Sequence, residues 1–144
     1  MRKGDCWLIN KRDVIRMKIP YPSINDKLAT SSHMYICRND IVDNYEFVKC
    51  QTLKPYMIYK NTMQHYWDEK PDINRNPFLH TTRIDCDKTF NTHFVHFDEA
   101  MKTKIRPDVS DEVFNKIEEE LISDGYSQID IPANDLKLLN YLIR

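Results

Sequence analysis

The stretch YEFVKCQT, residues 45–52, decides the fold class of this chain. Val48, Cys50 and Thr52 recur at every second position, so they share one face of a strand, and the residues between them point the other way. Alternation of this kind is typical of a strand whose one face lies on a core. Other strands that pair with this one are therefore expected elsewhere in the chain.

Further segments carry the same strand signal on both sides of this stretch. They are residues 5–9, 33–37, 81–87, 90–97 and 129–131. Residues 10–19 interleave basic and apolar side chains and favour a strand or a hairpin arm. Residues 23–33 are small and polar and indicate an exposed loop. The turn-forming residues at 38–40 are expected to end the strand at 33–37. Residues 54–78, with three prolines, are expected to form a long loop with at most one helical turn.

The C-terminal third changes from strand to helix patterns. Ser110 can cap a helix over 110–123, and Gly125 can end it. A last helix is expected over 134–143, where leucines recur at helical spacing. This order predicts a mainly β protein with α elements: a small antiparallel barrel decorated by C-terminal helices.

Length and composition set limits on the function. The 144 residues fit a single domain over 1–144. There are 21 basic and 22 acidic residues, a net charge of −1, which excludes a generally basic nucleic-acid coat but leaves room for a local basic patch. Two glycines are too few for a glycine-rich phosphate loop. There is no apolar run of membrane-spanning length and no signal peptide, so we expect a cytoplasmic protein with reduced thiols and no membrane partner.

Potential metal ligands are close in sequence but poorly spaced. His80, Cys86, His93 and His96 match no known zinc pattern, so no metal and no cofactor are expected. Nor does a local signature support a cysteine hydrolase. The aromatic loop 56–67 could stack nucleic-acid bases or cover one end of the barrel, and both interpretations stay open.

Basic residues gather near the N-terminus. Lys11, Arg12, Arg16 and Lys18 are candidates for contacting an RNA backbone. A solvated hairpin arm explains them equally well.

Several segments together resemble the MazF/PemK-like toxins of the Kid/CcdB superfamily. They are KGDCWLI at 3–9, IPYP at 19–22, MYIC at 34–37, VKCQT at 48–52, TRIDCD at 82–87 and the terminal helix at 134–143. The resemblance implies an SH3-like barrel. It also implies a type II toxin–antitoxin endoribonuclease that dimerises, cleaves RNA without a metal ion and is blocked by an antitoxin protein.

The resemblance also assigns candidate catalytic residues. Thr52 matches one catalytic position, whereas SSH at 31–33 stands where the family has Arg-Pro. His33 could serve as acid or base, and Lys27 or Arg16 could supply the missing positive charge. In an antiparallel hairpin the start of one strand lies beside the end of the next, which would bring Lys27, His33 and Thr52 together. The alternative is a catalytically inactive SH3-like barrel that binds protein or nucleic acid, for example in a phage or in phage defence.

Overall fold

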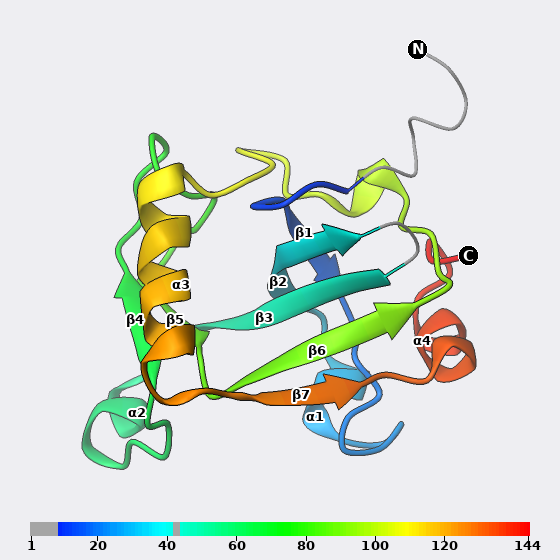
Figure 1. The fold of residues 1–144 in the computed structure, drawn as a ribbon, viewed down its shortest axis with the longest axis horizontal. Helices are drawn as coiled ribbons and strands as arrows, with labels where there is room; N and C mark the ends of the chain where they lie inside the picture. The colour runs from blue at the N-terminus through cyan, green and yellow to red at the C-terminus, as the bar shows by residue number, and fades with distance from the viewer. Residues whose placement is uncertain (1–8, 42–43) are drawn as a thin grey trace.

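The structure, a computed structural model, describes residues 9–41 and 44–144, so most of the expected strand at 5–9 lies outside the described residues. A sheet occupies the centre of the molecule and helices lie around it (Figure 1). The elements in chain order are β1 (Val14–Met17), α1 (Lys27–Thr30), β2 (His33–Ile41), β3 (Asn44–Thr52), α2 (Pro55–Tyr59), β4 (Tyr66–Glu69), β5 (Thr82–Asp85), β6 (Lys88–His93), a 3₁₀ turn (Glu99–Met101), α3 (Asp111–Asp124), β7 (Ser127–Asp130) and α4 (Ala133–Leu139).

Strand β3, the stretch that decides the fold, is central to the sheet. The strand order is β1-β2-β3-β5-β4, and β6 also pairs with β3 and carries β7 on its other edge. The pairs are antiparallel except for β6 with β7. The expected mainly antiparallel β architecture with helices is thus confirmed. Among the described strands no pairing joins β1 to β4 or β7, so the sheet is open and the expected SH3-like barrel is not confirmed.

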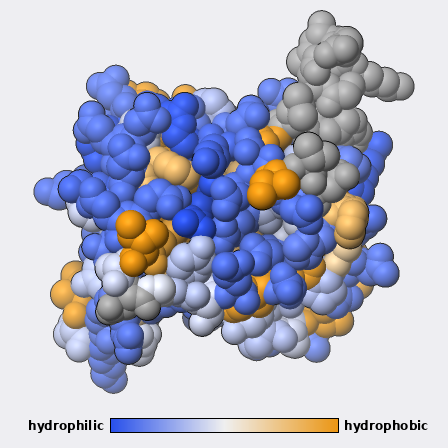
Figure 2. Space-filling model, viewed as in Figure 1, coloured by the Kyte–Doolittle hydropathy of each residue, from blue (hydrophilic) through white to orange (hydrophobic). Residues whose placement is uncertain are grey.

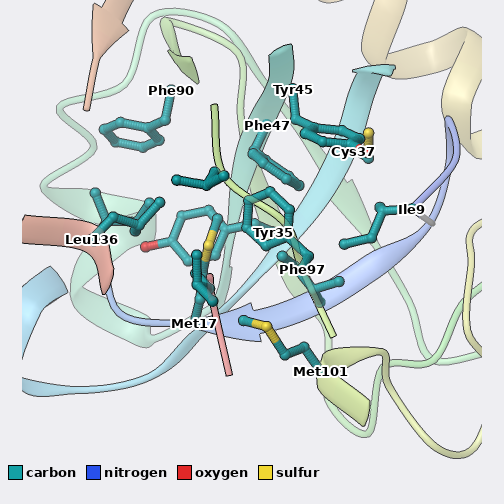
Figure 3. Close-up of a cluster of buried hydrophobic side chains, with 14 of the residues drawn as sticks. Ile9, Met17, Tyr35, Cys37, Tyr45, Phe47, Phe90, Phe97, Met101 and Leu136 are labelled. Atoms are coloured by element: carbon teal, nitrogen blue, oxygen red, sulfur yellow. The ribbon is translucent and has the colours of Figure 1, made fainter. Parts of the chain in front are cut away.

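The two-residue period of the central strands gives the sheet two separate cores. On one face Tyr35, Phe47 and Phe90 pack with Phe97 and with Leu136 of α4 (Figure 3). On the other face Val48, Cys50 and Ile84 pack against the apolar stripe of α3 formed by Val113, Ile117 and Leu121. Burial of both faces is the main source of stability expected for such a sheet.

The C-terminal helices follow their sequence signals closely. The Ser110 hydroxyl oxygen accepts a hydrogen bond from the Val113 backbone N–H at 3.3 Å, and α3 ends at Gly125 with φ of 80°. Helix α4 is shorter than expected because Asn140 leaves the helix. Its side-chain oxygen accepts from the Lys18 backbone N–H at 2.8 Å and its amide donates to the Lys18 carbonyl at 2.7 Å.

Other elements also differ from the sequence-based expectations. Strand β2 continues through the expected turn at 38–40 with a register shift between Cys37 and Asn39, and the Arg38 side chain there pairs with Glu46 at 3.0 Å and Glu118 at 2.9 Å. The region 54–78 contains the one helical turn expected there, α2, but it also contains strand β4, which pairs with β5. The expected loop over 23–33 contains α1.

The surface is mostly polar. Figure 2 shows hydrophilic residues over most of one face, with apolar residues in separate patches. Within the described part of the chain, no helix has both the length and the apolar character needed to cross a membrane.

Candidate functional site

A cleft of about 400 Å³ lies where β2 begins and β3 ends. Met34 of β2 pairs with Cys50 of β3, so the first residue of β2 and the last residues of β3 are neighbours. The residues that matter for its chemistry are Lys27, His33, Lys49, Thr52, Lys54 and Tyr56. The structure thus brings the three candidate catalytic residues, Lys27, His33 and Thr52, to one cleft.

The cleft is basic. Three lysines, Lys27, Lys49 and Lys54, line it together with His33, and no carboxylate is among its lining residues in the part of the chain that the structure describes. None of these lysines makes an ion pair with another residue of 9–41 or 44–144. Uncompensated positive charge in a concave site attracts anions, and a phosphodiester is the common biological anion of this size.

The alternation of side chains along β3 places Lys49 on the same face of the sheet as Tyr35. Lys49 pairs with Tyr35 across the hairpin, and therefore lies beside an aromatic core residue. Burial lowers the pKa of the Lys49 ammonium, Asp85 opposes this, and Lys88 and Lys27 add to the lowering. The carboxylate of Asp85 is already bound by the Lys88 ammonium at 2.9 Å. Lys49 is thus a partly buried cation with a weakened hold on its proton.

His33 has a defined tautomer when it is neutral. Its Nδ1 atom lies 3.0 Å from the Ser31 carbonyl oxygen. A carbonyl can only accept, so Nδ1 carries the proton and Nε2 of the neutral ring keeps its lone pair. Burial lowers the pKa of His33, the hydrogen bond to Ser31 opposes this, and the charges of Lys49 and Lys27 lower it further. Neutral His33 therefore has the electronic form of a general base near neutral pH.

Tyr56 extends the cleft toward a second one. A neighbouring cleft of about 290 Å³ shares Lys49, Gln51 and Tyr56 with the first. The Tyr56 side chain is 54% exposed, so its ring is available to stack on a ligand. By contrast, Arg83 in the second cleft is held by Asp68 at 2.8 Å and lies over the Tyr66 ring at 3.8 Å, which makes it a structural residue.

The candidate RNA-binding residues do not join the cleft. Arg16 and Lys18 line a different pocket, beside the end of α4. Arg12 lies at the start of α3, with its guanidinium 3.3 Å from Asp111. The backbone N–H of Lys11 donates to the Asp40 carboxylate at 3.1 Å. Met17 pairs with His33 across β1 and β2, but the side chains of its neighbours Arg16 and Lys18 line the other pocket rather than the cleft.

Sequence reasoning missed Lys49, Lys54 and the specific role of Tyr56 in this cleft. In the sequence, Lys49 stands out only as a charged residue on the strand face opposite to Val48, Cys50 and Thr52. Tyr56 stands out only as part of the aromatic loop. No local signal marked them as partners of His33. Their grouping depends on the register of β2 against β3, which no local sequence pattern reveals.

Potential metal ligands stay apart. Within residues 9–41 and 44–144, no three His, Cys, Asp or Glu side chains gather as a metal site would require. Cys37, Cys50 and Cys86 are buried free thiols, and burial raises the pKa of each. Such thiols are unreactive packing residues.

Comparison with known proteins adds no relative to this picture. No protein-family model, curated protein or solved structure matches the chain. The likeness to MazF/PemK-like toxins rests on the sequence segments alone, and a functional assignment rests on the chemistry of the cleft.

Proposed function

We propose that the cleft cleaves RNA by a metal-independent transesterification. The observation that carries the proposal is the grouping of His33 with Lys27, Lys49 and Thr52 in a cleft without a lining carboxylate among the described residues. Lysines repel a divalent cation and suit a phosphodiester directly. The residue types therefore match a reaction in which protein groups supply the base, the acid and the positive charge.

In the proposed reaction, Nε2 of His33 removes the proton from a ribose 2′-hydroxyl. The 2′-oxygen forms a bond to the adjacent phosphorus and the bond from phosphorus to the 5′-oxygen breaks. The departing 5′-oxygen takes a proton from the Lys49 ammonium, whose pKa burial lowers. The products are a 2′,3′-cyclic phosphate and a 5′-hydroxyl. Lys27 and the Thr52 hydroxyl stabilise the charge that develops on the phosphate oxygens.

The proposal includes a biological setting taken from the resemblance. The chain would be the toxin of a type II toxin–antitoxin system, act in the cytoplasm as a homodimer and be blocked by an antitoxin protein. Its open sheet would be a relative of the SH3-like barrel. Growth arrest on expression in a bacterium would support the toxin role. A monomer in sedimentation at high protein concentration would contradict the dimer.

A second candidate function is a binding module without catalysis. It is favoured by the sequence SSH at 31–33, which replaces the Arg-Pro of the resembling family. The same basic cleft would then hold a polyanion without cleaving it.

The test is single-turnover cleavage of a long RNA in the presence of a metal chelator. Wild-type protein is expected to give cyclic-phosphate ends, and a substrate with 2′-deoxyribose at the cleaved position is expected to resist. Lys70→Gln removes an exposed lysine outside the cleft and is the matched control. Absence of cleavage with binding that depends on Lys27 and Lys49 would establish the binding module, and absence of both would overturn both candidates.

A further inference from the structure

A further pocket, of about 370 Å³, shares no lining residue with the basic cleft, although its lining residue Met17 pairs with His33 of that cleft. It is bounded by the end of β1, the turn Glu99–Met101 with the residues after it, and the end of α4. Its size falls in the lower part of the range for small-molecule sites, roughly 300–1,000 Å³. The volume suits one small ligand.

The floor of this pocket is apolar. Met17 and Met101 line it and are themselves 2% and 6% exposed, so they belong to the aromatic core of the sheet. Leu139 and Leu142 of the α4 region form another wall. A hydrocarbon placed here would be in contact with thioethers and leucine methyl groups, which favour it over water.

The remaining side chains of note around the pocket are cationic. Arg16, Lys18, Lys102 and Lys104 line it, and no acidic residue does so among those described. Lys102 is neutralised by Asp13 at 3.1 Å. Arg16, Lys18 and Lys104 make no ion pair within residues 9–41 and 44–144, although the Lys104 ammonium donates to the Ala100 carbonyl at 3.0 Å. The pocket therefore combines an apolar floor with uncompensated positive charge.

The wall that carries Lys18 is fixed in place. Asn140, itself buried, holds both the backbone N–H and the carbonyl of Lys18, at 2.8 Å and 2.7 Å. A pocket with a fixed wall loses little freedom when a ligand enters.

We propose that this pocket binds an acyl carboxylate of medium chain length. The hydrocarbon lies on Met17, Met101 and the leucines, and the carboxylate is held by Lys18, Lys104 or Arg16. A neutral amphiphile lacks the ionic contact and a cationic one is repelled. This pocket shares no lining residue with the basic cleft, so ligand binding here does not depend on RNA cleavage.

The experiment follows the methyl groups of methionine in protein labelled with ¹³C at those positions. Decanoate, kept below its micelle concentration, is expected to shift Met17 and Met101 in a saturable way. Met57 and Met63 line the neighbouring cleft of about 290 Å³, and their methyl signals should not shift. Decanol, which loses the ionic contacts of the carboxylate with two lining lysines, is expected to bind on the order of tenfold more weakly, and decyltrimethylammonium not at all.

Two variants make the test specific. Lys18→Gln with Lys104→Gln is expected to weaken decanoate binding on the order of tenfold and to leave decanol binding unchanged, and Lys70→Gln is the matched control. Ala100→Phe adds a ring to an exposed lining residue and is expected to block both ligands in a folded protein. No saturable shift of Met17 or Met101, equal shifts of all the methionines, or equal affinity for the three amphiphiles overturns the proposal.

Discussion

The Nδ1 atom of His33 lies 3.0 Å from the carbonyl oxygen of Ser31, two residues earlier in the chain. This contact fixes the neutral ring with its proton on Nδ1 and its lone pair on Nε2. It links a local turn before β2 to the chemistry of the cleft, because the same ring lines the cleft with Lys27 and Lys49. The first prediction follows from it.

The rate of RNA cleavage should rise with pH as His33 becomes neutral, and should fall again at higher pH where the Lys49 ammonium loses its proton. Burial and two lysines lower the pKa of His33, so the rise should lie below pH ~6.5, the ordinary value of an imidazole. His33→Ala should be slower by about 10²–10⁴ and lose this rise. Thr52→Ala should be slower and keep it. An unchanged rise in His33→Ala would show that another group is the base.

Thr52 should matter through its hydroxyl. Thr52→Ala should slow cleavage on the order of a hundredfold, the effect of losing one hydrogen-bond donor to a developing oxyanion. Thr52→Ser keeps the hydroxyl and should stay close to the wild type. Single-turnover rates check this, and circular dichroism checks that each variant is folded. Equal loss in both variants would point to packing of the Thr52 methyl group instead.

The Glu69 carboxylate should make the free energy of unfolding depend on pH in the acidic range. Burial would raise its pKa, but hydrogen bonds from Arg75 at 2.9 Å, Trp67 at 3.1 Å and Asn76 at 2.7 Å outweigh burial and lower it. A lowered folded-state pKa gives stability that is complete above the unfolded value, about pH 4.3, and is lost as pH falls through the folded value.

The measurement for Glu69 is urea unfolding of wild type and Glu69→Gln. At pH 7 the variant should be less stable than the wild type, since the Arg75 guanidinium loses one of its two carboxylate partners and keeps only Glu112, at 2.8 Å. At pH 3 the difference should shrink. A difference that stays constant with pH would mean that the ionised form of Glu69 is not what stabilises the fold.

Removal of the Tyr35 hydroxyl should stabilise the fold. The hydroxyl oxygen is buried and has no hydrogen-bond partner in the described part of the chain. Tyr35→Phe should therefore raise the free energy of unfolding by about 1 kcal/mol, because a buried unsatisfied polar group is costly. Tyr126→Phe is the control with the opposite sign, since the Tyr126 hydroxyl accepts a hydrogen bond from Arg38. Urea unfolding measures both, and destabilisation by Tyr35→Phe would contradict the prediction.

Local signals predicted the long elements well. The alternation at 45–52 corresponds to β3 at Asn44–Thr52, and the capped stripe at 110–123 corresponds to α3 at Asp111–Asp124. Both are long enough for their periodicity to be read from the chain itself. Strand β4, at Tyr66–Glu69, was missed because it spans four residues among prolines and depends on pairing with β5. The extension of β2 beyond Cys37 was missed because residues 38–40 are turn-forming types, and the Arg38 side chain there pairs with Glu118, a residue of α3.

The sequence by itself determined that the chain is mainly antiparallel β with late helices, and that Lys27, His33 and Thr52 could meet at the end of one hairpin. Those conclusions need only the period of side chains and the direction of neighbouring strands. The tertiary structure decided that the sheet stays open, that Lys49 joins the cleft, and that Arg16 and Lys18 line another pocket. These outcomes depend on strand register and on which helix covers which face, and both are set by contacts between residues far apart in the chain.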